Sequence, residues 1–557
     1  MKTLISNATV VDGSGAERRT ADVLLDGSVI AEMADAGSLT AAGADRVIDA
    51  HGLVLSPGFI DMHAHSDLQL LVNPDHYAKL SQGVTTELLG QDGLSYAPVD
   101  DATLAGVREK IAGWNGNPAD FDWNWRSVGE YLDRLDTPDE GDGEDHGGRI
   151  ATNAAYLVPQ GTVRAMVMGF DEGDPTPEQQ QRMQDVVRAA MEEGAVGMSS
   201  GLTYTPGMYA TTEELAGLCR VVGELGGFYA PHHRSYGKNA LGAYAEMIEL
   251  SRHSGCALHL SHATMNFAEN KGRAGELLDL IDSALDDGAD ITLDTYPYLP
   301  GATTLSAILP GWASAGGTEA TLARLSDPAT RARIRETVEI YGSDGCHGVV
   351  AEWDTLEISG VQNPALAGYV GRTIKDIAAE TGEEEFDVFA RILTDDRLGT
   401  GILQHVGHEE NVQTIMKHRT HTSGSDGLLV GAKPHPRAWG TFPRYLGHYS
   451  RDLGLLSLED MVHHLTGRPA ARLKLRNRGL IREGFAADVV LFDPETIRDE
   501  ATFDNPRQAA SGIHYVFVNG TAAIDGGRPT GARSGRALRR HSDGLTREIG
   551  INREGKQ

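Results

Sequence analysis

The pattern of apolar and polar positions divides most of the chain into two kinds of region. Over residues 3 to 56, short apolar runs alternate with glycine and aspartate turns, which predicts a small antiparallel β unit. From about residue 58, apolar strands alternate with amphipathic helices, such as the one that begins near Pro177 and ends at Gly194. This alternation is typical of a parallel α/β architecture.

The α/β region contains enough predicted strands for a closed barrel. Seven apolar runs of strand length alternate with the helices, and an eighth strand over residues 422–426 would close the barrel. The first strand leads into His63, and the next six are predicted at residues 84–89, 153–158, 195–200, 228–233, 257–262 and 291–296. The segment 300–420 contains no clear barrel strand, and it is interpreted either as a lid over the active site or as a plain structural excursion.

Strand-like runs return after residue 478, at 487–492 and 514–520, and we expect them to pair with the N-terminal strands. The predicted organisation is a β domain made of residues 1–57 and 478–531, a barrel over 58–477 with an insertion at about 300–420, and a tail over 532–557. The tail carries several arginines and little to bury, which predicts a disordered segment or an oligomer arm.

Composition narrows the possible functions. A chain of 557 residues suits a large barrel with an accessory domain, and its net charge of −30 argues against a nucleic-acid partner. Three widely separated cysteines argue against a disulfide framework and favour a reducing cytoplasm. No apolar run is long enough to span a bilayer, so we expect no membrane partner. The number of subunits stays open.

Polar side chains gather at the predicted carboxyl ends of the strands. His63 and His65 are spaced i and i+2, which places both imidazoles on one face of a strand. Any one of these groups alone is more often a packed core residue or a turn residue than a metal ligand. Four imidazoles and two carboxylates at one barrel mouth nevertheless fit one or two divalent metals. These candidate ligands are His63, His65, Asp92, His232, His262 and Asp426.

The sequence resembles the amidohydrolase superfamily and, more closely, the N-acyl-D-amino-acid deacylases, or D-aminoacylases. The resemblance rests on motifs spread over nearly the whole chain, at residues 57–65, 81–86, 197–202, 294–298, 424–427, 435–444 and 484–493. It implies a distorted TIM (β/α)8 barrel with a small β-sandwich built from both termini. It also implies zinc-dependent hydrolysis of an amide bond in a small-molecule substrate.

The resemblance also implies roles for individual residues. His63 and His65 would bind one metal together with Asp426, while His232 and His262 would bind the other. Asp426 would be the general base, and Arg437 with Tyr296 would recognise the substrate carboxylate. The predicted substrate-binding set consists of Arg437, Tyr296, Tyr204 and Thr303. From the residues alone, a surface salt bridge for Arg437 is an equally good interpretation.

Three positions depart from the family pattern. Asp92 stands where these deacylases typically carry a cysteine ligand, Thr264 replaces a lysine, and Ala302 replaces a serine that commonly helps to hold the carboxylate. A carboxylate can still bind or bridge two zinc ions, but it is a harder ligand than a thiolate. Asp92 therefore favours a binuclear site and a shift of metal preference toward manganese or cobalt.

Three functions compete at this point. The leading hypothesis is metal-dependent hydrolysis of the linear amide of N-acyl-D-amino acids by metal-activated water. A cyclic-amide hydrolase of the hydantoinase or dihydroorotase type is the alternative, but those enzymes usually carry a carbamylated lysine between their metals. The nearest lysines here, Lys79 and Lys110, lie in helical or loop contexts. A non-catalytic binding protein on a decayed barrel is disfavoured because every ligand position carries a competent residue.

Overall fold

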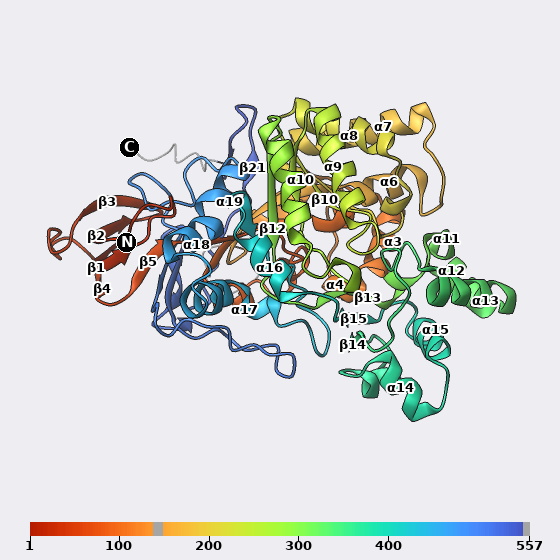
Figure 1. Cartoon of the computed structure of the whole chain (residues 1–557). Coiled ribbons are helices and arrows are strands. Elements are labelled where there is room, and N and C mark those ends of the chain that lie inside the picture. Colours follow the sequence, from red (N-terminus) through yellow and green to blue (C-terminus); the bar gives the residue numbers. More distant parts are fainter. Residues whose placement is uncertain (138–148, 550–557) are drawn as a thin grey trace.

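The computed structural model describes residues 1–137 and 149–549. Two large sheets organise it: one with strands from both chain ends, and one formed by the central strands, which helices surround (Figure 1). In the described part of the chain, no helix has both the length and the apolar character that crossing a bilayer requires. The residues of the predicted tail beyond 549 lie outside the described residues.

The central sheet contains eight parallel strands whose order follows the sequence. They are β6 (Phe59–Asp61), β7 (Val84–Leu89), β8 (Asn153–Pro159), β9 (Gly197–Gly201), β10 (Phe228–His232), β11 (Ala257–Leu260), β12 (Ile291–Thr295) and β16 (His421–Ser423). The last strand returns to the first, where the backbone N–H of Met62 donates to the carbonyl of Ser423 at 3.0 Å. All eight predicted strands are therefore present, and the predicted barrel is confirmed.

Helices cover the outside of the barrel because each carries one apolar face. In α7, Thr176 and Gln179 form a capping box, and Met183, Val187 and Met191 lie buried on one face of the helix. The principal covering helices are α6 (Gln160–Met168), α7 (Pro177–Glu192), α8 (Thr212–Glu224), α9 (Ala240–Ser254), α10 (Ala274–Asp286), α16 (Glu409–Met416), α18 (Leu458–Leu465) and α19 (Gly467–Arg472).

Further helical elements lie between the barrel strands and after the last one. They are α1 (Gln69–Val72), α2 (Tyr77–Leu80), η1 (Gln91–Gly93), α3 (Asp101–Lys110), α4 (Ala112–Asn115), α5 (Val128–Asp136), η2 (Gly207–Tyr209), η3 (Ala268–Asn270), α17 (Arg437–Arg444) and η7 (Tyr445–Asp452). The connections that follow the strands contribute to the same end of the barrel, where enzymes of this fold place their active sites.

The second large sheet joins the two ends of the chain, as expected from the sequence. Strand β5 pairs antiparallel with β17, with Pro57 opposite Val489. The sheet contains β1 (Lys2–Val10), β2 (Arg19–Asp26), β3 (Val29–Asp35), β4 (Arg46–Asp49), β5 (Val54–Pro57), β17 (Val489–Phe492), β18 (Ile513–Val518), β19 (Thr521–Asp525) and β20 (Arg528–Pro529). It joins the barrel directly, because only Gly58 separates β5 from β6.

The segment 300–420 contains a small sheet that the sequence reading missed. Three antiparallel strands, β13 (Gly301–Thr304), β15 (Gly401–Gln404) and β14 (Leu356–Gly360), pair in that order. They are short and begin or end at glycine, so they lack the apolar alternation that reveals a strand. Helices accompany this sheet: α11 (Gly311–Ser314), α12 (Gly317–Ser326), α13 (Pro328–Glu336), α14 (Ile374–Thr381) and α15 (Glu385–Asp395).

The chain beyond residue 532 differs from the expected tail over its described part. Ala154 of β8 donates its backbone N–H to the carbonyl of Arg536 at 3.0 Å, and Leu538 donates back to Ala154 at 2.8 Å. The side chains of Ala537 and Leu538 are completely buried. Two short strands follow, β21 (Arg539–Arg540) and β22 (Thr546–Arg547). Tertiary backbone contacts, rather than local apolar content, order this segment.

Candidate metal centre

The six predicted ligands come together at the carboxyl ends of the barrel strands. His63 and His65 follow β6, Asp92 lies in η1 after β7, and His232 is the last residue of β10. His262 follows β11, and Asp426 follows β16. All six side chains are buried. A barrel collects the ends of its strands around one mouth, which is why residues separated by up to 363 positions meet here.

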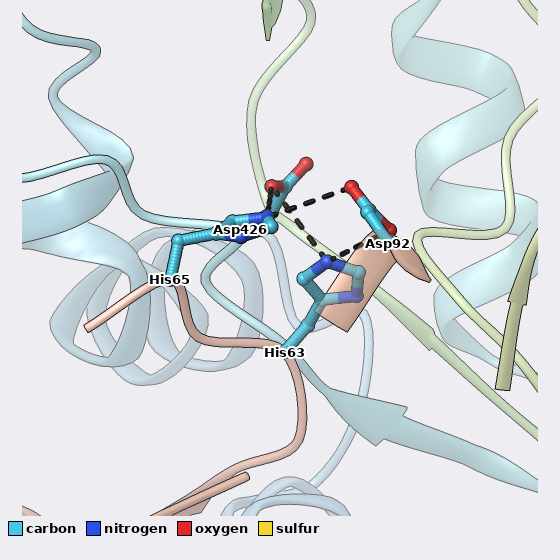
Figure 2. A group of neighbouring side chains, drawn as sticks. All are labelled: His63, His65, Asp92 and Asp426. Atoms are coloured by element: carbon cyan, nitrogen blue, oxygen red, sulfur yellow. Dashed lines mark hydrogen bonds and ion pairs between the residues drawn. The ribbon is translucent and has the colours of Figure 1, made fainter. Parts of the chain in front are cut away.

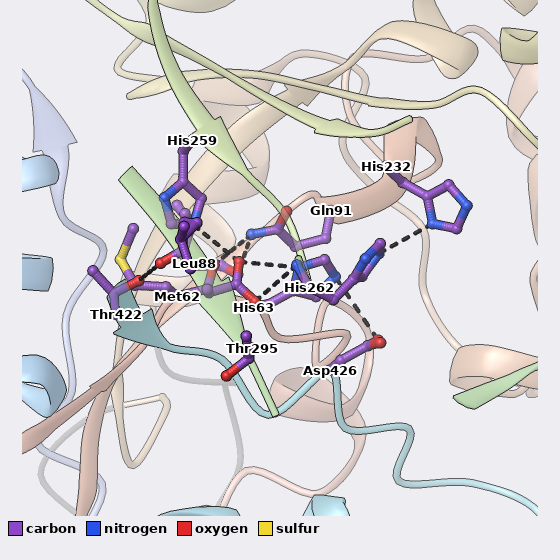
Figure 3. A network of polar contacts seen from close by, with 12 residues as sticks. Met62, His63, Leu88, Gln91, His232, His259, His262, Thr295, Thr422 and Asp426 are labelled. Carbon is purple, nitrogen blue, oxygen red and sulfur yellow. Dashed lines mark hydrogen bonds and ion pairs between the residues drawn. The ribbon is translucent and has the colours of Figure 1, made fainter. Parts of the chain in front are cut away.

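The ligand atoms form two overlapping groups. In the first, one atom each from His63, His65, Asp92 and Asp426 lies within 4.8 Å of the others (Figure 2). In the second, Asp92 meets His232 and His262 at similar separations. Nδ1 of His232 lies 3.0 Å from Nε2 of His262, and a dashed line joins the two rings in Figure 3. We call these groups the first half and the second half of the centre.

Asp92 belongs to both halves. Its Oδ1 lies 3.5 Å from Nε2 of His63 and 3.4 Å from Nε2 of His262. Its Oδ2 lies 3.5 Å from Nε2 of His65 and 3.6 Å from Nδ1 of His232. Burial disfavours the charged form, but His63, His262 and His232 outweigh it and hold the pKa of the Asp92 carboxyl well below its usual value. The Asp92 carboxylate therefore faces all four imidazoles.

Asp426 links the first half to a buried arginine. Its Oδ1 lies 3.1 Å from Nε2 of His65, and its Oδ2 forms an ion pair of 2.9 Å with Nη2 of Arg437. Burial raises the pKa of the Asp426 carboxyl, but the Arg437 guanidinium and the His65 hydrogen bond outweigh burial and lower it. Asp426 is therefore ionised near neutral pH, as a ligand or a general base requires.

The residues of the centre fit a divalent metal. Among the described residues, neither ring nitrogen of His63 has a hydrogen-bond partner, and the same is true of Oδ1 of Asp92. Buried polar atoms without partners are costly, and a metal ion satisfies nitrogen and carboxylate donors together. Asp92, His262 and Asp426 also have positive φ angles of 53°, 33° and 48°. Such backbone conformations are uncommon for residues other than glycine and are found more often at functional sites.

Local structure holds the Asp426 loop against the first histidine. A Cβ on Gly424 would lie 2.5 Å from Oδ1 of Asp294 and 2.8 Å from the Cβ of His63, so only glycine allows this approach. Asp294, near the end of β12, accepts the backbone N–H of His262 at 3.0 Å, and its Oδ2 lies 2.9 Å from Nε2 of His259. Sequence reasoning missed Asp294, although its strand-end position was the available signal.

A buried charge network lies behind the first half. Nζ of Lys79 donates to Oδ2 of Asp61 at 2.6 Å and to Oγ of Ser425 at 2.7 Å. Glu87 lies 3.5 Å from the same ammonium and 2.6 Å from Nε2 of His76. Lys79 thus lies near the centre, where its ammonium is held in an ion pair with Asp61.

Three of the four predicted substrate-binding residues line one cavity with the metal centre. Tyr204, Tyr296 and Thr303 border a space of about 70 Å³ that also touches both halves. The hydroxyls of Tyr204 and Thr303 lie 3.0 Å apart. Thr264 and Ala302, two further positions that the sequence analysis singles out, border the same cavity. Tertiary structure therefore gathers the chemically unusual positions around one space.

Arg437 is placed differently from the other three. Its side chain is completely buried, and its guanidinium carbon lies 4.4 Å from the ring centroid of Tyr296. Within the described structure, its Nε and Nη1 atoms have no hydrogen-bond partner, although Nη2 pairs with Asp426. The surface salt bridge considered from the sequence is therefore wrong. The guanidinium keeps donors available beside the cavity wall.

The segment 300–420 contributes a histidine that sequence reasoning missed. His347 borders the cavity, and its ring centroid lies 6.4 Å from that of His232. Burial, together with His232 and His262, lowers the pKa of the His347 imidazole to about 3, so it is neutral at physiological pH. No strand pattern marks this residue, which explains why the sequence did not reveal it.

Eight parallel strands with imidazoles and carboxylates at their carboxyl ends define a barrel metalloenzyme. More specifically, this chain belongs to the amidohydrolase family, whose model matches residues 46–523. It is 35% identical over 538 residues to a D-aminoacylase of Alcaligenes xylosoxydans xylosoxydans, covering 96% of this chain and 97% of the relative. The predicted resemblance to the D-aminoacylases is therefore confirmed.

Solved structures agree with this assignment. The N-acyl-D-glutamate deacylase from Bordetella bronchiseptica, solved with zinc and a phosphonate inhibitor, matches with a TM-score of 0.79 and 32% identity, covering 96% of this chain and 99% of that one. A D-hydantoinase shares only 17% identity, with a TM-score of 0.54 over 98% of this chain and 100% of its own. The hydantoinase likeness concerns the fold alone.

Proposed function

We propose that the chain is a metal-dependent amidohydrolase that cleaves the linear amide of N-acyl-D-amino acids and releases a carboxylate and a D-amino acid. The observation that carries this proposal is the convergence of both ligand groups on Asp92, with Arg437 beside Asp426. The deacylases to which the chain is similar over nearly its whole length support the same reaction. We place the reaction in the cytoplasm, where the three free cysteines stay reduced.

We propose zinc as the metal, with manganese or cobalt as alternatives because Asp92 is a harder ligand than a thiolate. His63, His65 and Asp426 would hold an ion in the first half, His232 and His262 would hold one in the second, and Asp92 would serve both. A divalent ion supplies Lewis acidity at such a site, which polarises an amide carbonyl and acidifies water.

The chain's own groups carry the remaining steps. Asp426, ionised by its neighbours, would take a proton from the attacking water and deliver it to the departing amine. The unmatched donors of Arg437 would bind the substrate α-carboxylate, since a guanidinium matches a carboxylate in bidentate geometry. The rings and hydroxyls of Tyr204, Tyr296 and Thr303 would bound the remaining space around the substrate.

The proposed reaction is tested with a panel of N-acetyl-D-amino acids, N-acetyl-L-amino acids and cyclic amides, with added zinc, cobalt or manganese. The expected result is metal-dependent hydrolysis of the D series, with metal bound in a stoichiometry of one or two ions per chain. Hydrolysis of the cyclic amides in preference to linear amides would replace the proposal with the hydantoinase-type alternative. A chain that binds none of these metals would refute both reactions.

A further inference from the structure

A second cavity of about 210 Å³ lies beside the metal centre. It shares the side chains of Trp114 and Tyr204 with the cavity of the centre. The two rings meet edge to face with centroids 5.0 Å apart, and they lie 5.3 Å and 4.8 Å from the imidazoles of His65 and His232, respectively. Trp114 and Tyr204 therefore border both cavities and contact candidate ligands of each half.

The lining of the second cavity is apolar with many hydroxyls. Leu94, Phe170 and Met208 supply apolar surface, while threonine and serine side chains from the barrel mouth and the segment 300–420 supply the hydroxyls. Its charged lining residues are Glu109, Lys110 and Arg397. Such a lining suits an aliphatic chain that ends in a hydrogen-bonding group.

The two cations of this lining differ in what they contact. Arg397 is exposed and already pairs with Glu319 of α12. Lys110, the last residue of α3, is half-buried, and no hydrogen bond or ion pair joins its ammonium to any described side chain. Burial lowers the pKa of the Lys110 ammonium to about 8, so most of the molecules carry this charge at pH 7. An ammonium that is partly desolvated and has no counter-ion is costly until an anion reaches it.

We propose that the second cavity receives a carboxylate-terminated arm of the substrate and that Lys110 selects it. The inference rests on the proposed function, in which the amide lies at the metal centre and the α-carboxylate lies at Arg437. Two arms of an N-acyl-amino acid then remain, the side chain and the acyl group. Either one can end in a carboxylate, and the cavity beyond Trp114 and Tyr204 is the adjoining space that one of them would enter.

The charge of the whole chain strengthens this reading. A net charge of −30 repels dianionic molecules from most of the surface, so a local cation is needed where such a molecule binds. The only carboxylate among the described cavity-lining residues is that of Glu109, which is itself exposed. An anionic arm in this cavity would therefore meet an ammonium and hydroxyls, with Glu109 as the single carboxylate among the described lining residues.

The kinetic test compares acids with matched amides. The first pair is N-acetyl-D-glutamate and N-acetyl-D-glutamine, and the second is N-succinyl-D-leucine and its terminal amide. In Lys110→Met, the KM for the acid of one pair should rise by about 10- to 100-fold, because the variant loses one charge-assisted hydrogen bond. The KM for the matching amide should change far less. The pair that responds identifies which arm enters. Lys417→Met, which removes the exposed lysine at the C-cap of α16, is the matched control.

A second readout separates this inference from the proposed reaction. Calorimetric binding of the same four compounds to the Asp426→Ala chain needs no turnover, and Lys110→Met in that background should weaken only the acid of the responding pair. If the wild-type chain hydrolyses none of the compounds but this selective weakening occurs, the reaction is wrong and the anion subsite stands. Equal binding of acids and amides, or equal losses on both in Lys110→Met, would overturn the subsite. Lys110→Arg, which keeps the charge, should restore part of the preference.

Discussion

The two halves of the metal centre use the same residue types in different surroundings. In the first half, Asp92 and carboxylates nearby overcome burial and raise the pKa values of His63 and His65. In the second half, burial prevails and lowers the pKa of His232, whose Nε2 lies 2.7 Å from the hydroxyl of Thr203. Charge therefore dominates the pKa values of His63 and His65, and desolvation dominates the pKa of His232. The pKa values of identical side chains therefore shift in opposite directions, depending on their neighbours.

Replacing Asp426, a residue of the first half alone, should have the largest effect on activity. Asp426→Ala removes a carboxylate that serves both as a ligand and as the proposed base, so kcat should fall by about 10³-fold or more. The fold should persist, since the residue lies on a loop after β16. Steady-state kinetics with circular dichroism checks both points. Activity within tenfold of the wild type would show that the base lies elsewhere.

The buried charge network behind the first half, which contains Lys79 and Glu87, predicts that the protein loses stability at low pH. Burial raises the pKa of Glu87, but His76 and Lys79 outweigh it and lower this pKa from 4.5 to about 2. The resulting stability is therefore complete above pH 4.5 and is lost as pH falls toward 2. Glu87→Gln should reduce the free energy of unfolding by about 3 kcal/mol at pH 7.

The difference between Glu87→Gln and the wild type should shrink as pH falls below 4.5, which denaturant titrations at several pH values would measure. The matched control lies beside the second half. Glu246 pairs with Arg234 at 3.1 Å and is partly exposed, so Glu246→Gln should cost about 1 kcal/mol or less. If the free energy of unfolding falls equally in both variants, the buried charge network behind the first half contributes no more than an exposed ion pair.

Asp92 tests whether the halves are joined. Asp92→Ala should weaken metal retention in both halves and lower kcat/KM by about 10- to 100-fold, because the carboxylate faces all four imidazoles. Asp92→Cys should retain metal and shift preference from manganese or cobalt toward zinc, since a thiolate is softer. Metal analysis after dialysis checks this. Loss confined to one half would show that Asp92 belongs to that half alone.

Replacing Arg437 should have the smallest effect, which should be selective for substrates that carry an α-carboxylate. Arg437→Met should raise the KM for N-acyl-D-amino acids by about tenfold, because it removes the donors proposed for the α-carboxylate. Substrates whose α-carboxylate is replaced by an amide serve as the control and should respond much less. An unchanged KM for the carboxylates would place their recognition elsewhere and leave Arg437 only its contact with Asp426.

The sequence by itself determined the eight barrel strands and the six residues that converge at the mouth. Strand patterning is local: alternation with helices marks the strands, and a polar residue at a strand's end must face the barrel mouth. The family motifs added the proposed roles of the ligands, and the identity of Asp92 already marked it as the unusual position.

Only the tertiary structure decided what surrounds those residues. The position of Asp92 between four imidazoles, the Lys79 network, His347 and the unpartnered Lys110 all depend on contacts between distant segments. Lys79 reaches Ser425 across 346 positions, for example, and no local pattern encodes that approach. Proton affinity and ligand selection follow from burial and neighbouring charge, which exist only once the barrel has closed.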